Sequence, residues 1–320
     1  MSVVIYKSDD AGAPALLANN AGALIAVLDA CLVDGYGAKA GAGWTKAFSD
    51  VNLAAYLQGT GGDGMYCRID DTSGPNARIR GYETMSDVNT GTGPFPTDVQ
   101  ISGGCYVNKH DGGAGSRKWM VVASPYAFYF WSQYDTNSAG SSSGLTFFGT
   151  IKSFKAVDDF GCMVMASPSS SKSNNVINSA QDNGGAWCAL NNSLLGHFIA
   201  RAYGQVGGAV PAGKRMESLR TRYQGFNSIS TYAKDWISNI LTGVFPSPVD
   251  GSINIAPVVV NESNAEDRGY LPGLWVPMHA HQSYGSIFDT FDGEGEHAGK
   301  TFVFFNVYGA HFALEITDTW

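Results

Sequence analysis

The stretch "LWVPMHAHQS" contains two histidines, His279 and His281, separated by a single residue. On a strand both imidazoles would point to the same side and could share a metal ion, at about 2.1 Å from each nitrogen. A metal site needs further ligands, but the next carboxylate, Asp289, is far along the sequence, and Pro277 disfavours a regular strand. A metal pair is therefore one hypothesis. We favour the other, that these are hydrogen-bonding loop or interface histidines, with no metal and no cofactor.

Other patterns that could support catalysis are incomplete. The acidic stretch "FDTFDGEGEH" lacks the glycine and glutamate register of a helix-loop-helix calcium site, so it predicts a solvated turn. The glycine pattern "GYGAKAGAG" follows a predicted helix rather than a strand, which is the wrong context for dinucleotide binding. The pattern G-x-S-x-G occurs only as "GSSSG" (140–144), inside the serine-rich tract "TNSAGSSSG", which predicts a loop rather than a nucleophile elbow. We therefore expect that the protein is not an enzyme.

Composition restricts the partners. The chain has 320 residues, of which 44% are hydrophobic and only 15% are charged, and its net charge is −8. Nucleic-acid binding needs a basic stripe, so this charge argues against it, whereas charge-poor surfaces cost less to desolvate against other subunits. The longest apolar segment, 22–33, is interrupted by Asp29 and is too short to cross a bilayer. We expect no membrane partner and no leader sequence, and we expect the five widely spaced cysteines to be reduced and mostly buried.

Periodicity predicts a mainly β (α+β) fold with antiparallel, sandwich-like sheets. One helix is expected over 23–33, where apolar residues recur at helical spacing and "DGYG" follows as a glycine stop. The C-terminal "TFVFFNVYGAHFALEITD" predicts a hairpin with Tyr308 opposite His311 and Val303 opposite Ile316. One hairpin face should meet the core, and the aromatic face should be partly covered by another element or subunit. Further strands are expected in "SVVIYKS", "AAYLQGTGGDGMYCRID", "ARIRGYETM", "KWMVVASPYAFYFWSQY", "LTFFGTIKSF" and "GCMVMAS".

Two domains are predicted, an N-terminal α+β domain over 1–166 and a C-terminal mainly β domain over 184–320. The Ser/Asn-rich segment 167–183 would join them, and a single domain is the alternative. Aromatic side chains are dense in the second strand of the hairpin within 118–134. Large aromatics are enriched at subunit interfaces. The residues that we predict for interfaces, some of which must be core, are Tyr126, Phe128, Tyr129, Phe130, Trp131, Trp275 and Trp320.

Several passages resemble a family of tailed-bacteriophage virion proteins. At the N-terminal end these are "VIYKSDDAGAPAL", "LIAVLDACLVDGYGAKAGAGWTKAF" and "ARIRGYETMSDVNTGTGPFP". At the C-terminal end they are "RGYLPGLWVPMH", "GKTFVFFNV" and "LEITDTW", so that His281 lies beyond the matching passage. The resemblance covers both ends of the chain and brings no catalytic residues with it.

The resemblance implies a structural protein of the virion, made in the cytoplasm of the host bacterium. Its partners would be copies of itself and other virion proteins, and its place would be the tail, baseplate or neck. Two alternatives remain open: a receptor-binding or glycan-binding protein at the distal tail, which would contact a host surface glycan, and a head decoration protein. A hydrolase that degrades the host envelope is a third, less favoured class.

Overall fold

The computed structural model describes residues 3–17, 19–109, 115–133, 143–167, 197–204, 214–217, 255–262, 267–277, 288–307, 310–317 and 320. These residues form a mainly β fold of antiparallel sheets, as the sequence predicts. The chain begins with β1 (Val4–Lys7) and β2 (Leu16–Leu17), followed by the helix α1 (Ala23–Leu28). The predicted helix continues as a π-helical turn, η1 (Asp29–Asp34), and ends at Gly35, whose φ of 78° favours glycine.

The N-terminal sheet has the strand order β3-β4-β5-β6-β7, with β8 paired to β6. Its strands are β3 (Thr45–Asp50), β4 (Leu53–Leu57), β5 (Tyr66–Asp70), β6 (Asn76–Asp87), β7 (Thr90–Phe95) and β8 (Cys105–Asn108). A separate strand, β9 (Ser116–Arg117), pairs with β2.

The central sheet has the order β1-β10-β11-β12-β14-β15. It consists of β1 together with β10 (Trp119–Ala123), β11 (Ala127–Gln133), β12 (Ser143–Thr150), β14 (Cys162–Met165) and β15 (His197–Ile199). The predicted hairpin is present: β10 pairs with β11 around Ser124 and Pro125. Strands β14 and β15 lie on either side of the predicted 167–183 linker and are hydrogen bonded to each other, so this sheet includes strands from both sides of that boundary. Residues 168–183 of the linker lie outside the described ranges.

The C-terminal sheet has the order β16-β17-β18-β21-β20-β19, with β13 paired to β18. Its elements are β13 (Lys152–Ser153), β16 (Lys214–Glu217), β17 (Ile255–Glu262), β18 (Asp267–Pro277), β19 (Thr290–Asp292), the short 3-10 helix η4 (Gly295–His297), β20 (Thr301–Val307) and β21 (Ala310–Glu315). Asp292, Glu294 and Glu296 are exposed. The predicted solvated turn is therefore present around η4, whereas the earlier part of the acidic stretch, Thr290–Asp292, forms β19.

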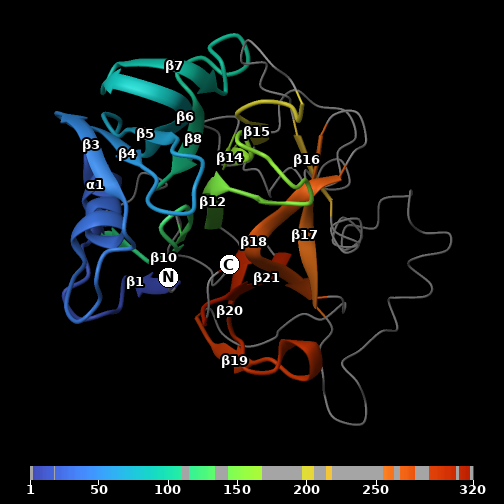
Figure 1. The fold of residues 1–320 in the computed structure, drawn as a ribbon. Coiled ribbons are helices and arrows are strands. Elements are labelled where there is room, and N and C mark those ends of the chain that lie inside the picture. The colour runs from blue at the N-terminus through green and yellow to red at the C-terminus, as the bar shows by residue number, and fades with distance from the viewer. Residues whose placement is uncertain are drawn as a thin grey trace, which may run out of the picture.

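The three sheets stack as layers, with the central sheet buried on both faces. In Figure 1 the green strands β12 and β14 lie between the blue-to-teal N-terminal strands and the orange C-terminal strands. One hydrophobic cluster joins α1 and the N-terminal sheet to one face of the central sheet, through Phe128, Phe130 and Phe148. A second cluster joins the opposite face, including Tyr129 and Trp131, to the C-terminal sheet. This double burial explains why β10, β11 and β14 are continuous apolar runs rather than alternating ones.

The C-terminal hairpin forms, but its predicted register is wrong by two residues. Val303 pairs with Leu314 rather than with Ile316, and Phe305 pairs with Phe312. Because strand side chains alternate with a period of two, an even shift leaves the same residues facing the core. The opposite face carries Phe302 and Phe304, which pack with Phe291 of the neighbouring strand β19 and with Trp275. This aromatic face is therefore partly covered by another element, as predicted.

Trp320 is buried in the cluster between the central and C-terminal sheets. Its indole stands edge-on to Tyr129 at a centroid distance of 5.4 Å, and its Nε1–H donates to the carbonyl of Glu315 at 3.0 Å. Its own carbonyl accepts a hydrogen bond from the Tyr126 hydroxyl. Gly273 makes this packing possible, because a Cβ at that position would overlap the indole ring.

We predict that Gly273→Ala destabilises the protein much more than Gly64→Ala. The two glycines have nearly the same φ, 69° and 70°, but a Cβ at Gly64 would meet nothing within 4 Å. Both variants incur the backbone cost of about 1–2 kcal/mol, whereas Gly273→Ala should add about 1–3 kcal/mol for displacing Trp320. Urea denaturation measures both free energies of unfolding, and equal losses in the two variants would show that Trp320 is not fixed in the core.

Candidate functional site

The outward face of the N-terminal sheet concentrates arginine and aromatic side chains. Strand alternation buries Cys67, Ile69 and Ile79 and leaves the residues between them facing outward. The outward residues pair across β5 and β6 as Tyr66 with Tyr82, Arg68 with Arg80, and Asp70 with Arg78. Phe48 of β3 stacks on Tyr66 at a centroid distance of 6.1 Å, which continues this face. We call this surface the arginine face.

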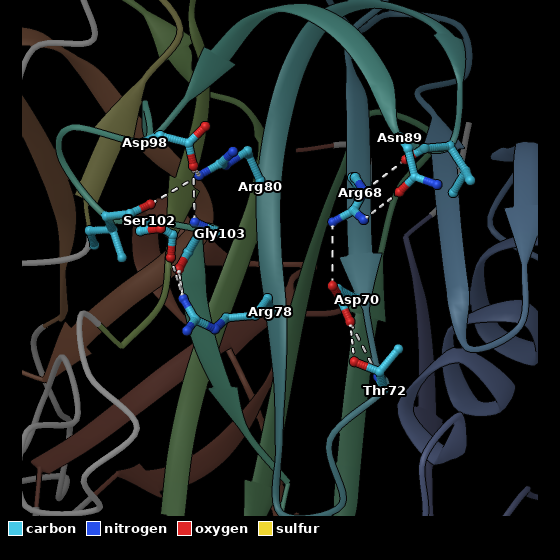
Figure 2. Close-up of polar contacts among 12 residues, drawn as sticks. Arg68, Asp70, Thr72, Arg78, Arg80, Asn89, Asp98, Ser102 and Gly103 are labelled. Carbon is cyan, nitrogen blue, oxygen red and sulfur yellow. Dashed lines mark hydrogen bonds and ion pairs between the residues drawn. The ribbon is translucent and has the colours of Figure 1, made fainter.

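The opposed arginines Arg68 and Arg80 turn away from each other, as Figure 2 shows. Arg80 donates to Asp98 at 2.7 Å and to the carbonyl of Ile101 at 3.0 Å. Arg68 donates to the carbonyl of Val88 at 2.7 Å and to the side chain of Asn89 at 3.0 Å. Like charges directly opposite each other in a sheet repel. The separate partners therefore hold each guanidinium in a fixed place on the face.

Arg78 makes more contacts with its surroundings than Arg68 or Arg80 does. Its Nη1 donates to the carbonyls of Ser102 and Gly104, at 2.6 and 3.0 Å, and its Nη2 donates to the hydroxyl of Tyr106. The guanidinium carbon lies 3.6 Å from the centroid of the Tyr106 ring, in a cation–π stack. Figure 2 shows Arg78 below the loop that carries Ser102 and Gly103.

A polar pocket of about 330 Å³ opens at this end of the arginine face. Its lining residues are Asp70, Thr72, Ser73, Asn76, Arg78 and Tyr106. Asp70 Oδ1 accepts hydrogen bonds from the hydroxyl of Thr72 at 2.7 Å and from its backbone N–H at 3.3 Å. The pocket thus lies among the three strands β5, β6 and β8 and the β5–β6 loop, 71–75.

A buried ion pair, on the inner side of the pocket, holds the β5–β6 loop in place. Asp71 and Lys109 are both fully buried, and the Lys109 ammonium donates to the Asp71 carboxylate. It also donates to the carbonyls of Ser73 and Asn20, each at 3.1 Å, and the Lys109 backbone N–H bonds to the carbonyl of Pro75. Burial raises the pKa of the Asp71 carboxyl and lowers that of the Lys109 ammonium, while their mutual attraction opposes both shifts.

The same carboxylate caps the helix. Asp71 Oδ2 accepts the backbone N–H groups of Leu24 at 2.7 Å and Ile25 at 3.3 Å, in the first turn of α1. The local N-cap residue is Gly22, which has no side chain to do this, so the capping group comes from a distant part of the sequence. One carboxylate therefore joins the start of α1, the β5–β6 loop and the end of β8.

A second charged network joins the three sheets. Arg268 of β18 makes a two-pronged ion pair with Asp158 at 2.8 and 2.5 Å, and both side chains are almost fully buried. Arg268 also donates to the carbonyl of Arg201 at 2.6 Å, and the Arg201 guanidinium pairs with Glu83 of β6 at 2.6 and 2.5 Å. Charge-assisted, two-pronged bonds of this kind fix orientation as well as contributing energy.

Asp63 lies beside this network with one carboxylate oxygen that is buried and has no hydrogen-bond partner among the described residues. Burial raises the pKa of Asp63 to about 7, and the negative charges of Asp158 and Asp159 act in the same direction. Thr150 and Arg268 oppose the shift. The carboxyl is therefore half-protonated near neutral pH.

The structure corrects most of the predicted interface residues. Phe128, Tyr129, Phe130 and Trp131 are buried within the chain because β11 belongs to the middle layer, and Trp320 is buried with them. These five are core residues. Tyr126 and Trp275 are half-buried and remain candidates. His279 and His281 lie outside the described residues, so the metal hypothesis stays a prediction.

The residues that sequence reasoning missed have little local signal. "DDTSGPN" was interpretable only as turn chemistry, and nothing near Lys109 indicates that it reaches Asp71 across 38 positions. Four cysteines, Cys31, Cys67, Cys105 and Cys162, are free and buried, as predicted, and burial raises the pKa of each thiol.

A comparison with protein-family models and with curated proteins found no match. Within the described ranges, no three His, Cys, Asp or Glu side chains are grouped in a way that could hold a metal ion. No helix in the same ranges is long and apolar enough to cross a membrane.

Replacing Lys109 by Met should strongly destabilise the protein, by about 3–5 kcal/mol, because it leaves the Asp71 carboxylate buried without its counter-charge. The free energy of unfolding in urea measures this loss. Lys7→Met is the control, since Lys7 and Asp9 form a partly exposed ion pair at 3.9 Å, and its effect should stay within about 0.5 kcal/mol. Equal effects in the two variants would contradict the proposed role of the buried pair.

Asp63→Asn should change the dependence of stability on pH. In the folded protein the pKa of Asp63 is about 7, whereas in the unfolded chain it is about 3.9. The folded state therefore keeps a proton that the unfolded state loses, and the wild-type protein loses stability as pH rises from about 4 to about 7. The variant lacks this loss and should be the more stable protein at about pH 8, with a much smaller difference at about pH 4. Denaturation across this pH range, with Asp50→Asn as an exposed control, measures the effect, and parallel profiles would refute it.

Proposed function

We propose that the chain is a structural subunit of a tailed-bacteriophage particle, placed in the tail, baseplate or neck. It acts by packing β-rich, aromatic surfaces against copies of itself and other virion proteins. Its site of action is the virion, and no catalytic step is assigned to it.

The observation that carries this proposal is where the virion-like passages lie in the fold. Those passages contribute α1, β3, β6 and β7 on one side of the central sheet, β18, β20 and the end of β21 on the other, and the edge strand β1 of the central sheet itself. Most of their elements thus belong to the two outer layers, which are the parts of the chain that neighbouring subunits can touch. The central sheet, by contrast, comes mainly from the middle of the sequence.

Trp275 is the residue that best supports a subunit contact. It lies on the face of the C-terminal sheet that points away from the central layer, edge-on to His297 at a centroid distance of 4.7 Å and to Phe302 at 6.3 Å. Its Nε1–H is buried and has no acceptor in the described part of the chain, so the support comes from the partly exposed ring alone. Large aromatic side chains are enriched among interface anchors.

The proposal is tested on phage particles purified by density-gradient banding from infected host cells. Mass spectrometry should find the protein in the banded particles, and gold-labelled antibodies should decorate the tail, baseplate or neck. Label over the capsid would favour head decoration instead. Absence of the protein from banded particles would refute the proposal.

Trp275→Ala should reduce incorporation into particles by about tenfold or more if the residue is an anchor. The matched control is Val99→Ala, because Val99 is 98% exposed and lies between β7 and β8 of the N-terminal sheet, in a different layer from Trp275. Both variants are first checked for unchanged cooperative unfolding. Normal incorporation of folded Trp275→Ala would remove Trp275 from the contact.

A further inference from the structure

The pocket on the arginine face has hydrogen-bonding groups that the described chain does not use. Asp70 Oδ2 receives no hydrogen bond there, and its nearest cation, Arg68 Nη1, is 3.8 Å away. The side-chain amide of Asn76 and the hydroxyl of Ser73 make no hydrogen bonds within the described ranges. Arg78 directs both Nη1 protons and one Nη2 proton at protein oxygens, which leaves its Nε–H and the other Nη2–H.

These groups form a mixed set of donors and acceptors with no net charge. Asp70 and Arg78 stand directly opposite each other on neighbouring strands, yet each is held by other partners rather than by the other. A carboxylate and a guanidinium can therefore both face a ligand in the pocket. The remaining lining groups are an amide and hydroxyls, which both donate and accept hydrogen bonds.

This chemistry matches sugar hydroxyl groups better than an ion. A carboxylate accepts two hydroxyl protons at once, and an amide beside it can bind the neighbouring hydroxyl. The Asp70 charge would repel a phosphate, and Arg78 would repel an ammonium group. The stacked Arg78–Tyr106 pair adds a flat wall, against which the apolar face of a sugar ring can lie. A volume of about 330 Å³ is at the small end of ligand sites, which is enough for one or two sugar rings.

The walls of the pocket are also rigid before any ligand arrives. Asp70, Asn76 and Arg78 stand on strands, and the Lys109–Asp71 pair holds the loop that carries Thr72 and Ser73. Fixing polar groups in advance lowers the entropy that binding costs.

We propose that this pocket binds a neutral saccharide, with Asp70 and Asn76 bonding to adjacent hydroxyls and Arg78 donating to a ring or hydroxyl oxygen. The proposal rests on the pocket alone and is independent of the proposed place in a virion. It holds equally for a sugar of a host surface polymer and for a free sugar.

The test uses ligand-detected saturation-transfer NMR on the full chain. The probes are methyl glucoside, methyl galactoside, methyl mannoside, methyl rhamnoside and N-acetylglucosamine, each at about 10 mM, a concentration suited to millimolar affinity. At least one neutral sugar should show saturation transfer and, in a separate protein-detected spectrum, should shift the side-chain amide signals of Asn76. Saturation transfer to glucuronate alone, or to no probe at all, would overturn the proposal.

Two variants assign the binding to the pocket. Asn76→Ala removes an amide that makes no hydrogen bond within the described residues, and Asp70→Asn keeps the shape while removing the charge. Each should weaken binding by about tenfold. Asp50→Asn is the control, because Asp50 lies in the same cross-strand row as Asp70, two strands away on the same sheet. Unchanged affinity in folded Asn76→Ala and Asp70→Asn would overturn the proposed site, whatever the particle-labelling experiment shows.

Discussion

The fully buried ion pair between Asp71 and Lys109 is the constraint on which the N-terminal half depends. Its carboxylate caps α1 through Leu24 and Ile25, and its ammonium holds the loop between β5 and β6. Two buried charges are costly unless their hydrogen-bonding capacity is used. Here the carboxylate accepts two backbone amides and the ammonium reaches two carbonyls, so the pair fixes the geometry of the helix, the loop and the pocket together.

The second organising constraint is the double burial of the central sheet. A sheet covered on both faces needs apolar side chains at every position, and β10 and β11 meet that need. Their dense aromatics therefore serve the core. The outer sheets have one covered and one open face, and they accordingly carry polar, arginine-rich or half-buried aromatic residues outward. This division places any recognition surface on the outer layers.

The sequence predicted local structure well because local structure follows from periodicity. The strands, the helix from Ala23 and the hairpin at Ser124 are all present. The predicted register of the C-terminal hairpin at Val303 was wrong because it was placed from turn chemistry alone. The predicted inward and outward faces of the same hairpin were correct because they depend only on the alternation of side chains along a strand. The interface residues on β11 were misassigned, since a continuous apolar run does not reveal whether it is a middle layer or a contact. The Asp71–Lys109 and Arg268–Asp158 pairs join residues far apart in sequence, and no local pattern encodes such pairs.

A rigid outer layer is what both a structural subunit and a saccharide pocket require, and the Asp71–Lys109 pair is the physical basis of that rigidity here. Native-state hydrogen exchange tests this claim most directly, by following the amides of Leu24, Ile25 and Lys109 in the wild type and in Lys109→Met. If one ion pair holds the helix start and the loop, all three amides should lose protection together in the variant. If Leu24 and Ile25 keep their protection while Lys109→Met frees only the loop, the helix and the loop are independent and the claim is wrong.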